Sequence, residues 1–140
     1  MIHEDYCTFE QSKALKEMGF DWDCHAYYDK RRQDGVIDRA LRFQNYNYDN
    51  DYMNSVSAPT LSQAAKWLRV KGIGITVQIY TKEKRDWGPN YFEGVFYRPY
   101  FTSTKDAHAM GIINNDFNSY EDALSAGIDG ALKILKDNRL

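Results

Sequence analysis

The sequence predicts an α+β domain: an antiparallel sheet of about three to five strands, with two or three helices packed mainly on one face. Three observations lead to this prediction. Helix-start patterns occur at residues 8–11, 60–63 and 119–122, apolar side chains alternate along residues 73–80, and residues 120–136 carry a helical apolar stripe. The 140 residues fit a single globular domain spanning 1–140, which is long enough to bury about two-thirds of its unfolded surface.

The first helix is predicted over residues 9–18. Thr8 precedes Gln11 by three positions, so the two side chains can satisfy the free backbone donors of a first helical turn. Gly19 suits the left-handed position that ends a helix, and Phe20 is then placed to fold back on Leu15.

Residues 21–44 are predicted to form a β-hairpin. Residues 24–28 and 37–43 are strand-like, and Asp34-Gly35 between them is a strong tight-turn pair. A short helical turn over residues 36–43 is the alternative. The polar segment 45–57, rich in Asn and Asp, is predicted to be a long surface loop.

The second half of the chain has clearer periodicity. A helix is predicted over residues 61–70, ended by Gly72, and residues 73–80 and 91–98 are predicted to pair as antiparallel strands. The stretch 99–118 lacks strong periodicity, so it either hides a short strand or serves as a binding loop. The last helix, over 120–136, is expected to pack on the strand face formed by its alternate residues Ile73, Ile75, Val77 and Ile79.

Composition limits the class of protein. The net charge of -2 argues against bulk attraction to nucleic acid or an anionic membrane, and no apolar stretch is long enough to cross a bilayer. The first residues lack the features of a secretory signal. Two cysteines, Cys7 and Cys24, are too few for a disulfide framework, so a cytoplasmic protein with reduced thiols is expected.

No motif for catalysis or for a cofactor is found. Cys24 and His25 lack the paired spacing of a zinc site, and the alternating Asn and Asp residues of 45–51 lack the glycine and glutamate of a calcium loop. No nucleophile, dinucleotide or phosphate-binding signature is present. We therefore expect no catalytic residue, metal ligand or cofactor, although a hydrolase site assembled from distant residues stays open.

Two basic clusters are candidates for contact with nucleic acid. Basic side chains interleaved with aromatic ones can follow a phosphate backbone and stack on unpaired bases. The alternative is that they are solvated hairpin tips that prevent association of sheet edges. The candidate residues are Lys30, Arg31, Arg32, Lys82, Lys84, Arg85 and Trp87.

The chain is also rich in tyrosine, with 11 residues. Tyrosine packs its ring while its hydroxyl stays in water, which suits contact surfaces. Tyr46, Tyr48 and Tyr52 in the polar segment are therefore candidates for contact with another protein.

Parts of the chain resemble a family of small uncharacterised proteins from phages, prophages and mobile elements of gut Bacteroidales. The resemblance covers the first thirty residues, the second helix and strand, and the last helix, but not the middle loops. It is carried by residues 58–69 (APTLSQAAKWLR), 119–128 (SYEDALSAGI), 16–22 (KEMGFDW) and the Tyr27-Tyr28 pair. It implies a phage-associated bacterial protein and carries over no catalytic residue.

The sequence thus predicts a small, non-enzymatic accessory protein, monomeric or homodimeric, that binds another protein and no membrane. The alternative is an accessory protein that binds nucleic acid through its basic hairpin loops.

Overall fold

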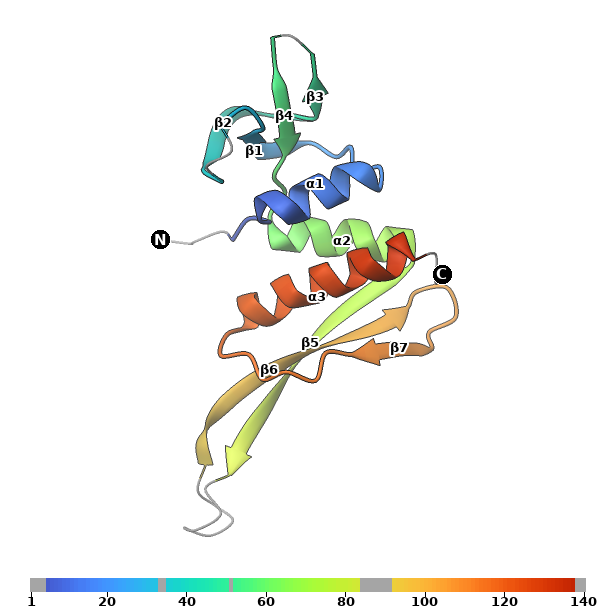
Figure 1. The fold of residues 1–140 in the computed structure, drawn as a ribbon. Helices are drawn as coiled ribbons and strands as arrows, with labels where there is room; N and C mark the ends of the chain where they lie inside the picture. Colours follow the sequence, from blue (N-terminus) through green and yellow to red (C-terminus); the bar gives the residue numbers. More distant parts are fainter. Residues whose placement is uncertain (1–4, 33–34, 51, 84–91, 138–140) are drawn as a thin grey trace.

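Two antiparallel sheets lie on opposite sides of a layer of three helices (Figure 1). The computed structural model describes residues 5–32, 35–50, 52–83 and 92–137. The four-stranded sheet has the order β2-β1-β4-β3 and the three-stranded sheet the order β5-β6-β7. This confirms the predicted α+β class, with the strands divided over two sheets. The strands are β1 (Cys24–Asp29), β2 (Ile37–Gln44), β3 (Tyr48–Asp49), β4 (Asn54–Ser57), β5 (Ile73–Glu83), β6 (Phe92–Ser103) and β7 (Ala109–Ile112).

The helices begin where the capping patterns predict. They are α1 (Phe9–Glu17), α2 (Leu61–Lys71) and α3 (Tyr120–Lys136). At α1 the Thr8 hydroxyl accepts from the Gln11 amide at 3.1 Å while the Gln11 side chain accepts from the Thr8 amide at 2.9 Å. The same pair of bonds caps α2, and Ser119 accepts from the backbone N–H of Asp122 at α3. The second helix ends at left-handed Gly72, with φ 115°.

The hairpin predicted within residues 21–44 is confirmed over β1 and β2, and the helical alternative is wrong, because β1 pairs antiparallel with β2. Of the predicted turn pair, Asp34 lies outside the described residues. The ladder contains a large bulge. Cys24 pairs with Gln44 and Ala26 with Arg39, so residues 40–43 of β2 stand opposite His25 alone. The bulge pushes Leu41 fully into solvent and leaves Phe43 53% exposed.

The prediction of a surface loop over residues 45–57 is wrong. The segment contains β3 and β4, and Tyr46, Ser55 and Val56 are buried. Side chains satisfy its backbone: the Ser55 hydroxyl donates to the Tyr46 carbonyl, and the Ser57 hydroxyl accepts from the Tyr46 amide, each at 2.7 Å. These bonds pair the backbone of Tyr46 and both serine hydroxyls where this part of the segment is buried.

The long β5–β6 hairpin exceeds its predicted length. Its register runs without a shift from Ile73 opposite Ser103 to Lys82 opposite Gly94, and after a shift Glu83 lies opposite Phe92. The hypothesis of a hidden strand within residues 99–118 is confirmed by β7, which pairs with β6.

The main core lies between the three-stranded sheet and the helices. It includes Ile73, Leu124 and Ile128, with Ile75 and Val77 packed against it, so the predicted contact between this strand face and the last helix is confirmed there. Ile79 departs from that prediction, since it is 61% exposed. No described helix is both long and apolar enough to cross a membrane.

The core position of Ile128 yields a stability prediction. Ile128 has no exposed surface, so Ile128→Ala is expected to lower the free energy of unfolding by about 2–5 kcal/mol through lost burial and a residual cavity. Urea denaturation followed by circular dichroism measures this. Leu41→Ala is the matched control, because the Leu41 side chain is fully exposed. A loss below about 0.5 kcal/mol for Ile128→Ala would contradict this packing.

A second prediction concerns Gly127 in α3. A Cβ added there would lie 2.8 Å from Cγ2 of Ile75 and 3.2 Å from Cβ of Pro99. Alanine normally stabilises a helix interior by about 1 kcal/mol over glycine, but overpacking costs about 1–3 kcal/mol. We therefore expect Gly127→Ala to destabilise the protein in urea denaturation. The cost should shrink when Gly127→Ala is made together with Ile75→Ala, and equal costs in both backgrounds would refute the clash.

Candidate functional site

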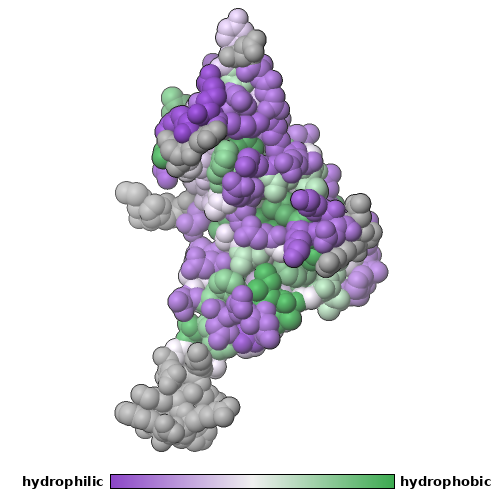
Figure 2. Space-filling model, viewed as in Figure 1, coloured by the Kyte–Doolittle hydropathy of each residue, from purple (hydrophilic) through white to green (hydrophobic). Residues whose placement is uncertain are grey.

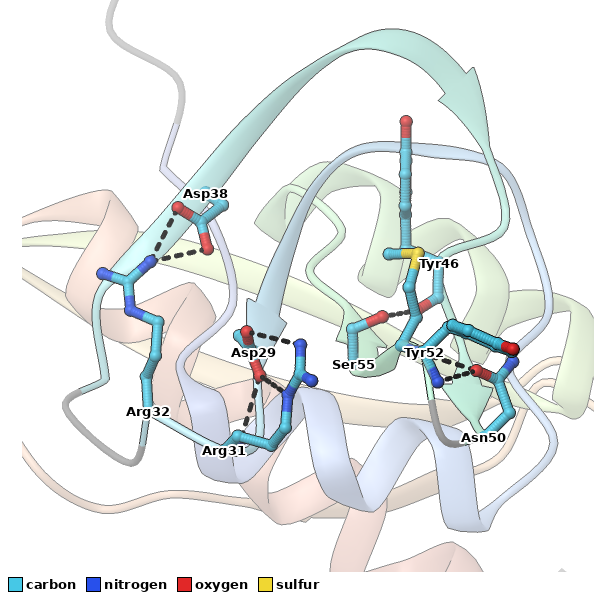
Figure 3. A network of polar contacts seen from close by, with 9 residues as sticks. Asp29, Arg31, Arg32, Asp38, Tyr46, Asn50, Tyr52 and Ser55 are labelled. Carbon is cyan, nitrogen blue, oxygen red and sulfur yellow. Dashed lines mark hydrogen bonds and ion pairs between the residues drawn. The ribbon is translucent and has the colours of Figure 1, made fainter.

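The first predicted basic cluster lies at the end of β1, and each of its side chains contacts an aspartate. Arg31 pairs with Asp29, with Nε 3.3 Å from Oδ1, and Arg32 pairs with Asp38 at 3.0 Å (Figure 3). Lys30 contacts Asp49 at 2.5 Å. The positive charge of this cluster is therefore largely offset by neighbouring carboxylates.

Asp49 joins two elements, since it also contacts Lys16 of α1 at 2.7 Å. Hydrogen bonds from Lys16 and Lys30 lower the pKa of the Asp49 carboxyl to about 2. The network thus connects β3 to the helical layer, and Lys30 shares the Asp49 charge with Lys16.

The second predicted cluster is described only in part. Lys84, Arg85 and Trp87 lie outside the described residues. Lys82 belongs to β5 and is in register with Gly94 of β6.

The three tyrosines predicted to contact a protein differ in position. Tyr46 is only 5% exposed, and its hydroxyl donates to the Arg42 carbonyl at 2.6 Å. Tyr48 is half-buried. Tyr52 is 90% exposed, and its amide is held by the Asn50 side chain, as Figure 3 shows. Of the three, Tyr52 is the one displayed to solvent, while Tyr46 supports the fold.

A surface that the sequence did not identify lies on the three-stranded sheet. Its inner residues, such as Ile73 and Phe101, are buried against the helices. Because side chains alternate along a strand, the residues between them point to the opposite face. We call this the open face, since Figure 1 places the helices on the other side of the sheet. It comprises Thr76, Gln78, Tyr80, Phe96, Arg98, Tyr100 and Thr102, which are all half-buried or exposed.

Aromatic side chains and one guanidinium make up the centre of the open face. Tyr80 and Phe96 are cross-strand partners whose rings stack with centroids 5.2 Å apart and planes 11° apart. The Arg98 guanidinium carbon lies 5.1 Å from the Phe96 ring centre and 5.6 Å from that of Tyr80. The three groups therefore form a single packed cluster.

Two further contacts hold this cluster in place. Arg98 donates from Nη2 and Nε to Oδ1 of Asp116, at 2.7 and 3.0 Å. The Tyr80 hydroxyl donates to Oε1 of Gln78 at 3.3 Å. The open face is consequently polar and aromatic with little net charge at its centre. In Figure 2, hydrophobic residues appear over the helices and the three-stranded sheet, whereas the end formed by β3 and β4 is mainly hydrophilic.

The thiols are not exposed. Cys7 and Cys24 are both buried, and burial raises the pKa of each, that of Cys24 to about 12, which favours the protonated form. Within the described ranges, no group of three or more His, Cys, Asp or Glu side chains is placed to hold a metal ion.

Comparison of the chain with protein-family models, with curated proteins and with solved structures finds no match.

The Asp49 network predicts a dependence of stability on pH. A carboxyl whose pKa is lowered in the folded protein stabilises it above the unfolded value, 3.8, and loses this contribution as the pH falls through about 2. Wild type should therefore exceed Asp49→Asn in urea midpoint at neutral pH, and the difference should shrink between about pH 4 and pH 2. A difference that stays constant over this range would contradict the network.

Proposed function

We propose that this chain is a small non-enzymatic accessory protein that binds another protein through the open face. The observation that carries the proposal is the Tyr80–Phe96–Arg98 cluster, which lies on a sheet face away from the helices. Aromatic residues and arginine are enriched in protein interfaces, while lysine and glutamate are depleted. Cross-strand stacking also fixes the rings before binding, which limits the conformational entropy lost on association.

The contacts within the cluster favour a protein partner over nucleic acid. Tyr80 and Phe96 stack on each other, and Arg98 lies against both rings. These contacts cover ring faces that would otherwise be available to stack on nucleic-acid bases. Arg98 is further paired with Asp116, which reduces its charge toward a phosphate. Rings fixed in this way offer their edges and the Tyr80 hydroxyl, which suit a protein surface with both polar and apolar groups.

The alternative is a nucleic-acid-binding accessory protein using the basic hairpin loops. The described residues give it less support, because Lys30, Arg31 and Arg32 each contact an aspartate. Its distinctive property would be binding that weakens steeply with salt. The resemblance noted in the sequence implies a gene carried by a phage or mobile element, and on that basis we propose the cytoplasm of a bacterial host as the location for either function.

The test is an affinity pull-down from Bacteroidales lysate, with and without nuclease, using wild type and two variants. We expect a specific protein to be retained after nuclease treatment. Tyr80→Ser with Phe96→Ser should weaken its binding by about 30-fold or more, since central aromatic residues commonly contribute at least 2 kcal/mol. Tyr52→Ser is the matched control, because it removes an exposed tyrosine far from the open face and should leave binding unchanged.

Two outcomes would overturn the proposal. If Tyr52→Ser abolishes partner binding and the double variant does not, the partner contacts the polar segment of residues 45–57 and not the open face. Retention of nucleic acid alone, weakened by salt and by charge reversal through Arg31→Glu and Lys84→Glu, would establish the alternative. Circular dichroism of each variant confirms that it is folded.

A further inference from the structure

An open cavity of about 450 Å³ lies beside the bulge of β2, on the side of the molecule that carries the four-stranded sheet. It is lined by the segment before β1, the bulge and the first turn of α2, which meet only in the folded chain. Its lining residues are Asp21, Trp22, Asp23, Phe43 and Gln63.

The two aromatic side chains that line the cavity, Trp22 and Phe43, each pack on a neighbouring ring. Trp22 is half-buried and packs on Phe20, with ring centroids 6.1 Å apart, and Phe20 packs in turn on buried Trp67. Phe43 is held by the ring of His25, with centroids 4.6 Å apart. The hydrogen bond from Tyr46 to the carbonyl of Arg42 anchors the bulge next to Phe43. Both rings are therefore positioned before any ligand arrives.

The carboxylates at the cavity differ from those of four aspartates elsewhere in the fold. Asp29, Asp38, Asp49 and Asp116 each pair with a basic side chain. Asp21 and Asp23 are exposed, and neither forms an ion pair within the described part of the chain.

Gln63 fixes the backbone beside these carboxylates. Its amide nitrogen donates to the Asp23 carbonyl at 3.3 Å, while its oxygen accepts from the Thr60 amide at 3.1 Å. The helix cap of α2 therefore also sets the position of the acidic segment. The cavity combines two aromatic surfaces with two carboxylates that form no ion pair with any residue the structure describes.

We propose that this cavity binds a cationic side chain of a partner protein, and that it prefers arginine to lysine. Aromatic faces attract cations, and carboxylates supply the opposite charge. Guanidinium is planar, stacks on rings and pairs with carboxylates through two parallel bonds, whereas ammonium is a compact and strongly hydrated charge. The site is independent of the open face, so the protein would have two binding surfaces of different chemistry.

The test follows the indole N–H of Trp22 and the ring of Phe43 by NMR while small probes are added to the full chain. The probes are the Nα-acetyl amides of arginine, lysine and norleucine; norleucine supplies a similar aliphatic chain without the charge. We expect saturable shifts with the arginine probe, with a dissociation constant on the order of 10 mM, weaker shifts with lysine and none with norleucine.

Asp21→Asn with Asp23→Asn should weaken arginine binding by about tenfold or more, since it removes both charges and retains shape. Glu121→Gln is the matched control, because it removes an exposed carboxylate on α3, away from the cavity. No saturable shift up to about 100 mM of either cation would overturn the proposal. Equal binding of norleucine, or unchanged binding by the double variant, would also overturn it. The Tyr80 and Phe96 variant should bind the arginine probe normally, which separates this test from that of the open face.

Discussion

The close approach of α3 to the β5–β6 hairpin is the constraint on which the rest of the structure depends. Two glycines one helical turn apart, Gly127 and Gly130, face this sheet, and a Cβ at Gly130 would lie 2.5 Å from the ring of Phe101. Because the backbone approaches so closely, Ile75 and Phe101 fill the space that side chains on α3 would otherwise occupy. Packing of this kind has few alternatives, so it sets the orientation of the helix on the sheet.

The opposite side of α3 is held by one buried polar side chain. Gln11 is 3% exposed and donates to both the carbonyl and the hydroxyl of Ser125, each at 3.0 Å. The same side chain accepts from the Thr8 amide and caps α1. A local cap therefore doubles as a tertiary contact between α1 and α3. Since α1 in turn contacts β4, this side chain helps to relate the two sheets.

The elements that the sequence predicted correctly depend on nearby residues. Capping pairs act over three positions, and the alternation from Ile73 to Ile79 is a property of one strand. The strands within residues 45–57 were missed because the hydroxyls of Ser55 and Ser57 bond the backbone of Tyr46, which lies nine and eleven positions away in the sequence. The Tyr80–Phe96 pair was missed because it depends on register, which alternation within each strand does not fix. The cavity requires residues 22, 43 and 63 to meet, and no local pattern indicates that.

The two candidate surfaces differ in a way that follows from the layered arrangement. The β5–β6 hairpin has one face against the helices, so its opposite face gains stability from cross-strand pairs such as Tyr80 and Phe96 and from the Arg98–Asp116 contact. The bulge of β2 is instead supported by single contacts, Tyr46 with Arg42 and His25 with Phe43. Beside it, the two aspartates before β1 form no ion pair with the residues that the structure describes. A neutral aromatic surface and an anionic cavity would not compete for one ligand. With the helical layer between them, occupation of both proposed surfaces would hold two different protein segments at a fixed separation.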